Sequence, residues 1–241
     1  MKSVLISIQP KWVEKIANGQ KTIEVRKTRP KLETPFKCYI YATKPKKWFR
    51  FSSWGYASDE SLWLSNGKVK MCNGFEFWAD DKEYEPLCGK VIGEFVCDRI
   101  CNYECELWND EAYELIRQFN YDEYGEIEYE HGAENNENCE MLNKACLTWQ
   151  DIRKYLGQGL NTCYAWHITD LKIYEKPKEL SEFKAVCNKV KHYETESKEF
   201  FEHCYSCEYL TEKSSCLDSF ECGKFISRPP QSWCYVENLG E

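Results

Sequence analysis

The chain has 241 residues, enough for one large domain or a domain with a small module, and 15% of its residues are aromatic. Its formal net charge is -8, whereas general nucleic-acid binders are typically basic, so the overall charge argues against that class. The sequence contains no run of eighteen apolar residues, so a membrane-spanning helix is excluded on length.

The charge is distributed unevenly along the chain. Residues 1–50 hold thirteen Lys and Arg against three acidic residues, while the rest of the chain holds nineteen against thirty-seven. This basic patch indicates either a local surface for an anionic partner or a surface that balances the acidic remainder. Its most prominent residues are Lys11, Lys15, Lys27, Arg29, Lys31, Lys44, Lys46, Lys47 and Arg50.

The amino-terminal stretch bears on the cellular compartment. Residues 1–10 have too short an apolar segment and no small-residue cleavage site, so they do not look like a signal peptide, and we expect a cytoplasmic protein. In that compartment the fifteen cysteines are expected to be reduced thiols or metal ligands and not disulfides.

A helix followed by a strand is predicted near the amino end. Apolar residues recur at helical spacing over 12–17, and Asn18-Gly19 fits a helix stop because glycine accepts a positive φ. From 21 to 27 apolar and polar residues alternate, so Glu24 and Arg26 share one face of a strand. Gly19-x-Lys21-x-x-Glu24-x-Arg26 therefore predicts a polar site of two cations and one carboxylate.

Further strands are expected at 36–42 and 91–97. Between them, residues 44–86 contain turn signals such as Asn66-Gly67, which predict an inserted, hairpin-rich segment. Within the second strand, Glu94 is expected on the face that also carries Ile92 and Val96.

Residues 101–140 carry thirteen acidic residues and one basic residue. We expect a helix at 110–119 and then a solvated acidic tract, with the alternative that the tract folds over the basic patch as a phosphate mimic. Thr148, an acid three residues later and Gly157 predict a short helix over 148–157. One strand is expected from 163 to 174.

The carboxyl-terminal part is rich in cysteine. Four thiolates are what a closed tetrahedral zinc site requires, and a metal would help a tail too small to build its own core. One C-x2-C pair is present and the second pair is wider, so structural zinc and a cluster of reduced thiols both stay open. The prolines of 228–235 predict an extended segment that docks Trp233 on the main body. The four candidate ligands, which we call the tail cysteines, are Cys204, Cys207, Cys216 and Cys222.

This ordered set of fragments resembles the ASCH domain, a PUA-like β-barrel family. The resemblance rests on the 19–26 motif, on the strand at 4–8 and the helix opened by Pro10-Lys11-Trp12, and on later fragments at 88–94 and 164–168. It implies an α+β protein with a PUA-like β-barrel over residues 1–185 flanked by short helices. Insertions then fall at about 44–86 and 101–145, and 186–241 forms a small Cys-rich extension.

The resemblance also implies an RNA or nucleotide ligand in a cleft lined by the motif. Lys21 and Arg26 suit a phosphate or a base carbonyl, and Glu24 suits an exocyclic amine. A less specific interpretation is a helix end followed by a strand whose polar face is solvated. The proposed ligand-binding residues are Lys21, Glu24, Arg26, Lys11, Trp12 and Arg29.

An enzyme is the main alternative. In the N4-acetylcytidine amidohydrolase branch of the family the motif reads Lys-x-x-Thr, and the lysine, the threonine and a distant glutamate are catalytic. Lys21 matches, but Glu24 stands in place of the threonine, and Glu94 and Glu140 are only loose matches for the distant glutamate. A hydrolase acting on RNA or a modified nucleoside, with Lys21 and Glu24 as catalytic residues, stays open. A third interpretation is a protein-interaction adaptor that uses the acidic run.

Overall fold

The computed structural model describes most of the main body and short parts of the segments that extend from it. The described residues are 2–44, 49–51, 55–57, 61–65, 68–72, 85–108, 113–121, 127–134, 139–157, 162–186, 210–212, 220–222 and 225–239.

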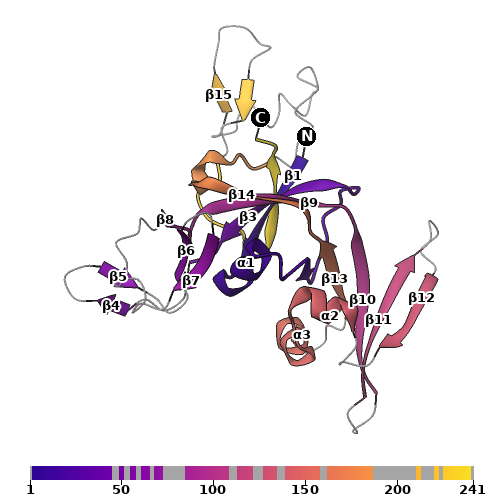
Figure 1. Ribbon diagram of the computed structural model, residues 1–241. Coiled ribbons are helices and arrows are strands. Elements are labelled where there is room, and N and C mark those ends of the chain that lie inside the picture. The colour runs from indigo at the N-terminus through magenta and orange to yellow at the C-terminus, as the bar shows by residue number, and fades with distance from the viewer. Residues whose placement is uncertain are drawn as a thin grey trace.

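Two five-stranded sheets form the main body (Figure 1). The first sheet has the order β14 (Thr169–Lys178), β9 (Val91–Cys97), β3 (Phe36–Ala42), β1 (Lys2–Ile8) and β17 (Trp233–Glu237). The second has the order β12 (Ile127–Glu134), β11 (Tyr113–Tyr121), β10 (Ile100–Trp108), β13 (Thr162–His167) and β2 (Ile23–Arg26). The mixed class, rich in strands with few helices, agrees with the prediction, but the described strands do not show a closed barrel.

Strand β1 lies inside the first sheet and is apolar on both faces. Val4, Ile6 and Ile8 pack into a core with β9 and Trp166, while Leu5 packs into a second core on the opposite face. A strand covered on both sides is expected to be continuously hydrophobic, as this one is. It pairs in parallel with β3 and antiparallel with β17.

Helix α1 (Pro10–Ala17) connects β1 to the motif. Proline at its first position suits the helix start, and the helix buries Pro10, Val13 and Ile16. After the C-cap residue Asn18, Gly19 adopts a φ of 72°, a value that favours glycine, and turns the chain toward β2. The predicted helix, stop and strand are all confirmed.

Two further short helices cover the second sheet. Helix α2 (Glu140–Ala145) and helix α3 (Trp149–Leu156) share a core with Ile23 and Val25 of β2. Thr148 and Asp151 form a reciprocal capping box at the start of α3, as the sequence predicts. A 3-10 helix at Leu180–Glu182 follows β14.

The 44–86 segment is hairpin-rich, as predicted. It contains the pair β4 (Phe49–Phe51) and β5 (Gly55–Ala57), and the sheet of β6 (Ser61–Ser65), β7 (Lys68–Cys72) and β8 (Glu85–Pro86). Ser65 pairs with Lys68 in the hairpin of β6 and β7, while the predicted turn residues Asn66 and Gly67 lie outside the described residues.

The helix predicted at 110–119 is wrong, because this segment contains strand β11. It pairs antiparallel with β10 on one side and β12 on the other. These neighbouring strands supply the hydrogen-bond partners of its backbone, and the spacing of apolar residues within the segment does not predict them. In the sheet order β11 and β12 lie at the end farthest from β2. The described part of the acidic tract therefore does not fold over the motif strand.

The single strand predicted at 163–174 is also incorrect. The chain breaks at Ile168 into β13 and β14, which belong to different sheets, and Asp170 has a positive φ of 46°. Strand β14 continues past Pro177, which is tolerated because β14 lies at the edge of its sheet.

The end of the chain returns to the main body. Strand β17 pairs with β1, with Trp233 opposite Ile6, and the Trp233 ring lies 6.0 Å from that of Trp166. The predicted docking of Trp233 is confirmed. Before it, β15 (Leu210–Glu212) and β16 (Phe220–Cys222) form a separate two-stranded pair. No helix in the described ranges combines the length and the apolar character that crossing a membrane requires.

Candidate ligand-binding site

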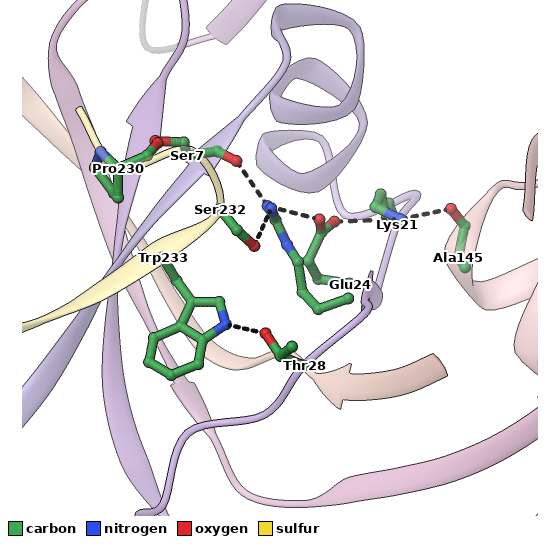
Figure 2. A network of polar contacts seen from close by, with 9 residues as sticks. Ser7, Lys21, Glu24, Thr28, Ala145, Pro230, Ser232 and Trp233 are labelled. Carbon is green, nitrogen blue, oxygen red and sulfur yellow. Dashed lines mark hydrogen bonds and ion pairs between the residues drawn. The ribbon is translucent and has the colours of Figure 1, made fainter. Parts of the chain in front are cut away.

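The structure brings Lys21, Glu24 and Arg26 together in one polar network. Figure 2 shows Lys21 and Glu24 within this network. Glu24 lies between the cations: its Oε1 is 3.0 Å from Nη2 of Arg26, and its Oε2 is 3.4 Å from Nζ of Lys21. The predicted convergence of the three side chains is confirmed. We call this set the buried triad.

The end of α1 and the alternation of β2 position these side chains. The backbone N–H groups of Gln20 and Lys21 both donate to the carbonyl of Lys15, at 2.8 and 3.0 Å, and fix the turn after the helix. In β2, Ile23 and Val25 face the core with α2 and α3, so Glu24 and Arg26 point to the opposite side.

Backbone and hydroxyl oxygens complete the network at both ends. Nζ of Lys21 donates to the carbonyl of Ala145 at 2.7 Å, at the carboxyl end of α2, where cations are favoured. Nη2 of Arg26 donates to the carbonyl of Ser7 at 2.7 Å, and Nη1 makes a longer contact of 3.4 Å with Oγ of Ser232. Figure 2 shows Ser7 and Ser232 on one side of Glu24 and Ala145 on the other.

The buried triad is almost completely covered. Lys21 is 2% exposed, and Glu24 and Arg26 are each 6% exposed. The interpretation as a strand with a solvated polar face is therefore wrong. The described structure therefore does not show the open cleft that the resemblance implies, because other groups cover the three side chains.

The triad carries an excess of positive charge. Burial lowers the pKa of Lys21, against the opposing influence of the Glu24 carboxylate. Nε of Arg26 is buried and has no hydrogen-bond partner among the described residues. Two cations around one carboxylate, with one N–H left over, suit an anion or a carbonyl group.

Around the triad lie the outer residues named from the sequence. Trp12 is half-buried, with Nζ of Lys11 4.4 Å and Nζ of Lys21 5.3 Å from its ring centroid. Lys11 and Arg29 are exposed. Trp12 is thus next to the triad, whereas Arg29 lies in the loop beyond the end of β2. In this loop the hydroxyl of Thr28 accepts a hydrogen bond from Nε1 of Trp233 at 3.0 Å.

Tyr155 is a neighbour of the triad that the sequence patterns do not predict. It is 39% exposed on α3, and the Nζ of Lys27 lies 5.2 Å from its ring centroid. Burial raises the pKa of Tyr155, and the positive charge of Arg26 opposes that shift. One sequence signal could have identified Tyr155: it is an aromatic residue at a position of a short amphipathic helix where the apolar spacing predicts exposure.

The two glutamates considered for catalysis have other partners. Glu94 accepts hydrogen bonds from Nζ of Lys37 at 3.1 Å and from the hydroxyl of Tyr174 at 2.6 Å, both in the first sheet. An irregularity in the pairing of β3 with β9 sends Ile92 into the core, so Glu94 does not share its face as predicted. Glu140 pairs with Lys144 at 2.6 Å. Neither carboxylate is bonded to Lys21 in the described contacts.

The tail cysteines stay a prediction. Cys204, Cys207 and Cys216 lie outside the described residues, and for Cys222 only the backbone of β16 is described. In the ranges that the structure covers, no group of three or more His, Cys, Asp or Glu is placed to hold a metal ion.

Comparison with known proteins finds distant structural neighbours. No protein-family model matches the chain, and no curated protein matches it in sequence. The crystal structure of ASCH from Zymomonas mobilis matches with 14% identity and a TM-score of 0.43, over 98% of this chain and 87% of that one. A serine-to-alanine mutant of the same Zymomonas mobilis protein matches with 14% identity and a TM-score of 0.42, over 98% of this chain and 88% of that one. Both neighbours are ASCH structures, at an identity and a TM-score that carry no further conclusion about this chain.

Proposed function

We propose that this chain binds RNA or a nucleotide, with Lys21, Glu24 and Arg26 at the inner end of the site and Lys11, Trp12 and Arg29 around it. The observation that supports this most is the charge of the buried triad, in which two cations share one carboxylate and the Arg26 Nε lacks an acceptor among the described residues. A phosphate or a base carbonyl supplies such an acceptor, and Glu24 accepts from an exocyclic amine.

In this proposal the ligand enters at the weakest contact of the triad. The 3.4 Å separation between Arg26 Nη1 and Ser232 Oγ is long for a hydrogen bond, whereas the contacts to the Ser7 and Ala145 carbonyls are both 2.7 Å. Rotation of the Ser232 side chain therefore costs little and frees one N–H of Arg26. In this proposal the ligand oxygen replaces the serine hydroxyl.

The outer residues supply steering and stacking. Lys11 and Arg29 are exposed, so they attract phosphate in a salt-dependent way. Trp12 offers a half-buried ring next to the Lys21 ammonium, where a splayed base can stack.

The test is binding of labelled single-stranded RNAs and of modified nucleotides, measured by fluorescence anisotropy at several salt concentrations. Replacing Lys11 and Arg29 together with alanine leaves the core intact and should weaken binding, while lowering the salt slope by about one for each phosphate that is no longer neutralised. Lys176→Ala is the control, because Lys176 is exposed on β14 in the other sheet. Absence of binding by the wild type, or an equal weakening in the control, would refute the proposal.

A hydrolase is the second candidate. The observation that favours it is the lowered pKa of Lys21 beside the Glu24 carboxylate, since a lysine more easily deprotonated can act as a general base. Incubation of the same RNAs and modified nucleosides with the wild type and with Lys21→Met, followed by chromatography, tests for products. Binding without product formation in the wild type would exclude this candidate for those substrates.

A further inference from the structure

Two large hydrophobic side chains are exposed in the described part of the chain. Tyr155 is 39% exposed and Phe225 is 50% exposed. Each ring has a lysine above it: Nζ of Lys27 is 5.2 Å from the Tyr155 centroid, and Nζ of Lys184 is 5.6 Å from the Phe225 centroid. Exposure and a neighbouring cation therefore do not by themselves distinguish Tyr155.

The position of Tyr155 does distinguish it. Helix α3 buries Trp149, Ile152 and Leu156 and leaves Tyr155 on its outer side. Nζ of Lys27 lies 5.2 Å from the ring centroid, and Lys27 directly follows Arg26 in the chain, so among the triad residues Arg26 is the one next to the Tyr155 platform along β2. The opposite end of the triad is formed by Lys21, with Trp12 beside it.

Lys27 is held at the Tyr155 ring by a second contact. It follows Arg26 directly in the chain, is exposed, and its Nζ donates to the carbonyl of Leu156 at 3.0 Å, at the carboxyl end of α3. A helix end attracts a cation, so this contact alone would explain Lys27 as a cap. The same contact also keeps an ammonium group beside an accessible aromatic face.

An aromatic residue paired with a lysine therefore lies at each end of the triad. Because Glu24 lies between Lys21 and Arg26, Trp12 with Lys11 is at one end and Tyr155 with Lys27 is at the other. Proteins that bind single strands combine stacking platforms for successive bases with cations for the phosphates between them. A free mononucleotide has one base and would use only one of the two platforms.

We propose that Tyr155 and Lys27 form a nucleotide subsite, in which a base stacks on Tyr155 and its phosphate contacts Lys27. The inference deepens the proposed function and rests on it. It narrows the partner to a single-stranded RNA of at least two nucleotides, with the neighbouring nucleotide at Trp12 and the triad.

The experiment uses the full chain and a labelled single-stranded RNA of about eight nucleotides, within the site sizes known for such binders. Tyr155→Ala and Tyr155→Leu remove the stacking face and should weaken binding by roughly tenfold. Tyr155→Phe keeps the ring and should stay within about twofold of the wild type. Phe225→Ala, the matched control with an exposed ring below a lysine, should bind like the wild type.

The outcomes separate this inference from the proposed function. Wild-type affinity in Tyr155→Ala and Tyr155→Leu, with weakened binding when Lys11 and Arg29 are replaced, would overturn the subsite and leave the proposed function standing. If the wild type binds no RNA, both fail. Nucleoside monophosphates used as competitors should displace the RNA only at much higher concentration, and equal affinity for them would overturn the two-nucleotide requirement. The Leu variant preserves the covered part of the side chain, so a folding defect in the Ala variant does not obscure the result.

Discussion

Removing the carboxylate of Glu24 should destabilise the fold strongly, because Glu24 is the only anion in the buried triad. Its two oxygens lie 3.0 Å from Arg26 and 3.4 Å from Lys21, and its side chain is 8% exposed. Breaking a buried ion pair by deleting one partner costs about 3–5 kcal/mol. Each cation keeps one carbonyl partner at 2.7 Å, on Ser7 and Ala145, so for Glu24→Ala we expect the lower end of that range, about 3 kcal/mol.

Glu24→Gln separates charge from hydrogen bonding. The amide retains an acceptor oxygen for one cation but loses the negative charge, so its cost should be smaller, about 1.5–3 kcal/mol for a hydrogen bond to a charged group. Urea unfolding at neutral pH measures both variants, with an unchanged m-value showing that only stability has altered.

Glu33→Gln provides the control, because Glu33 is an exposed carboxylate in the loop after β2. It should change the free energy of unfolding by no more than about 0.5 kcal/mol. A destabilisation of less than about 1 kcal/mol in Glu24→Ala, close to this control, would refute the view that the triad is a desolvated network.

The pH dependence of stability, two glycines and the tail cysteines offer three more tests. Burial lowers the pKa of Lys21 below its usual 10.5, so the unfolded chain binds more protons there between the lowered pKa and about 10.5. The stability difference between the wild type and Lys21→Met should therefore shift in favour of the wild type as pH rises through that interval, and a flat or opposite trend in urea unfolding would contradict it. A Cβ on Gly93 would lie 2.4 Å from the carbonyl oxygen of Lys172, so Gly93→Ala should cost about 1–3 kcal/mol by forcing β9 and β14 apart. Gly19 has a positive φ and open space around it, so Gly19→Ala should cost about 1–2 kcal/mol. If thermal unfolding shows that only Gly19→Ala is destabilised, the clash predicted at Gly93 is refuted. If the tail cysteines form a structural zinc site, elemental analysis should find about one zinc per chain and chelation should unfold the tail; less than about half an equivalent, with no change on chelation, would argue for reduced thiols.

Local patterns were sufficient for the elements around the site. The helix stop at Asn18-Gly19, the alternation through β2 and the capping box of α3 are each set by residues within a few positions of one another. Such signals depend on backbone preferences and side-chain direction, which neighbours in the chain largely decide. The shared face of Glu24 and Arg26 could therefore be predicted from the sequence.

Local patterns failed where pairing partners lie far along the chain. The segment of β11 has helix-compatible spacing but is held as a strand by β10 and β12. The break at Ile168 arises because β13 joins β10 and β2 while β14 joins β9, a choice between two sheets that no short window contains.

The local sequence determines that two cations and a carboxylate come together after α1, because turn chemistry and strand alternation act over a few residues. The burial of these side chains depends on the tertiary structure, since the groups that contact them come from Ser7, Ala145 and Ser232 in three separate parts of the chain. The place of Tyr155 beside Lys27 likewise depends on long-range packing, because the core that α3 shares with β2 holds this helix next to the end of the strand.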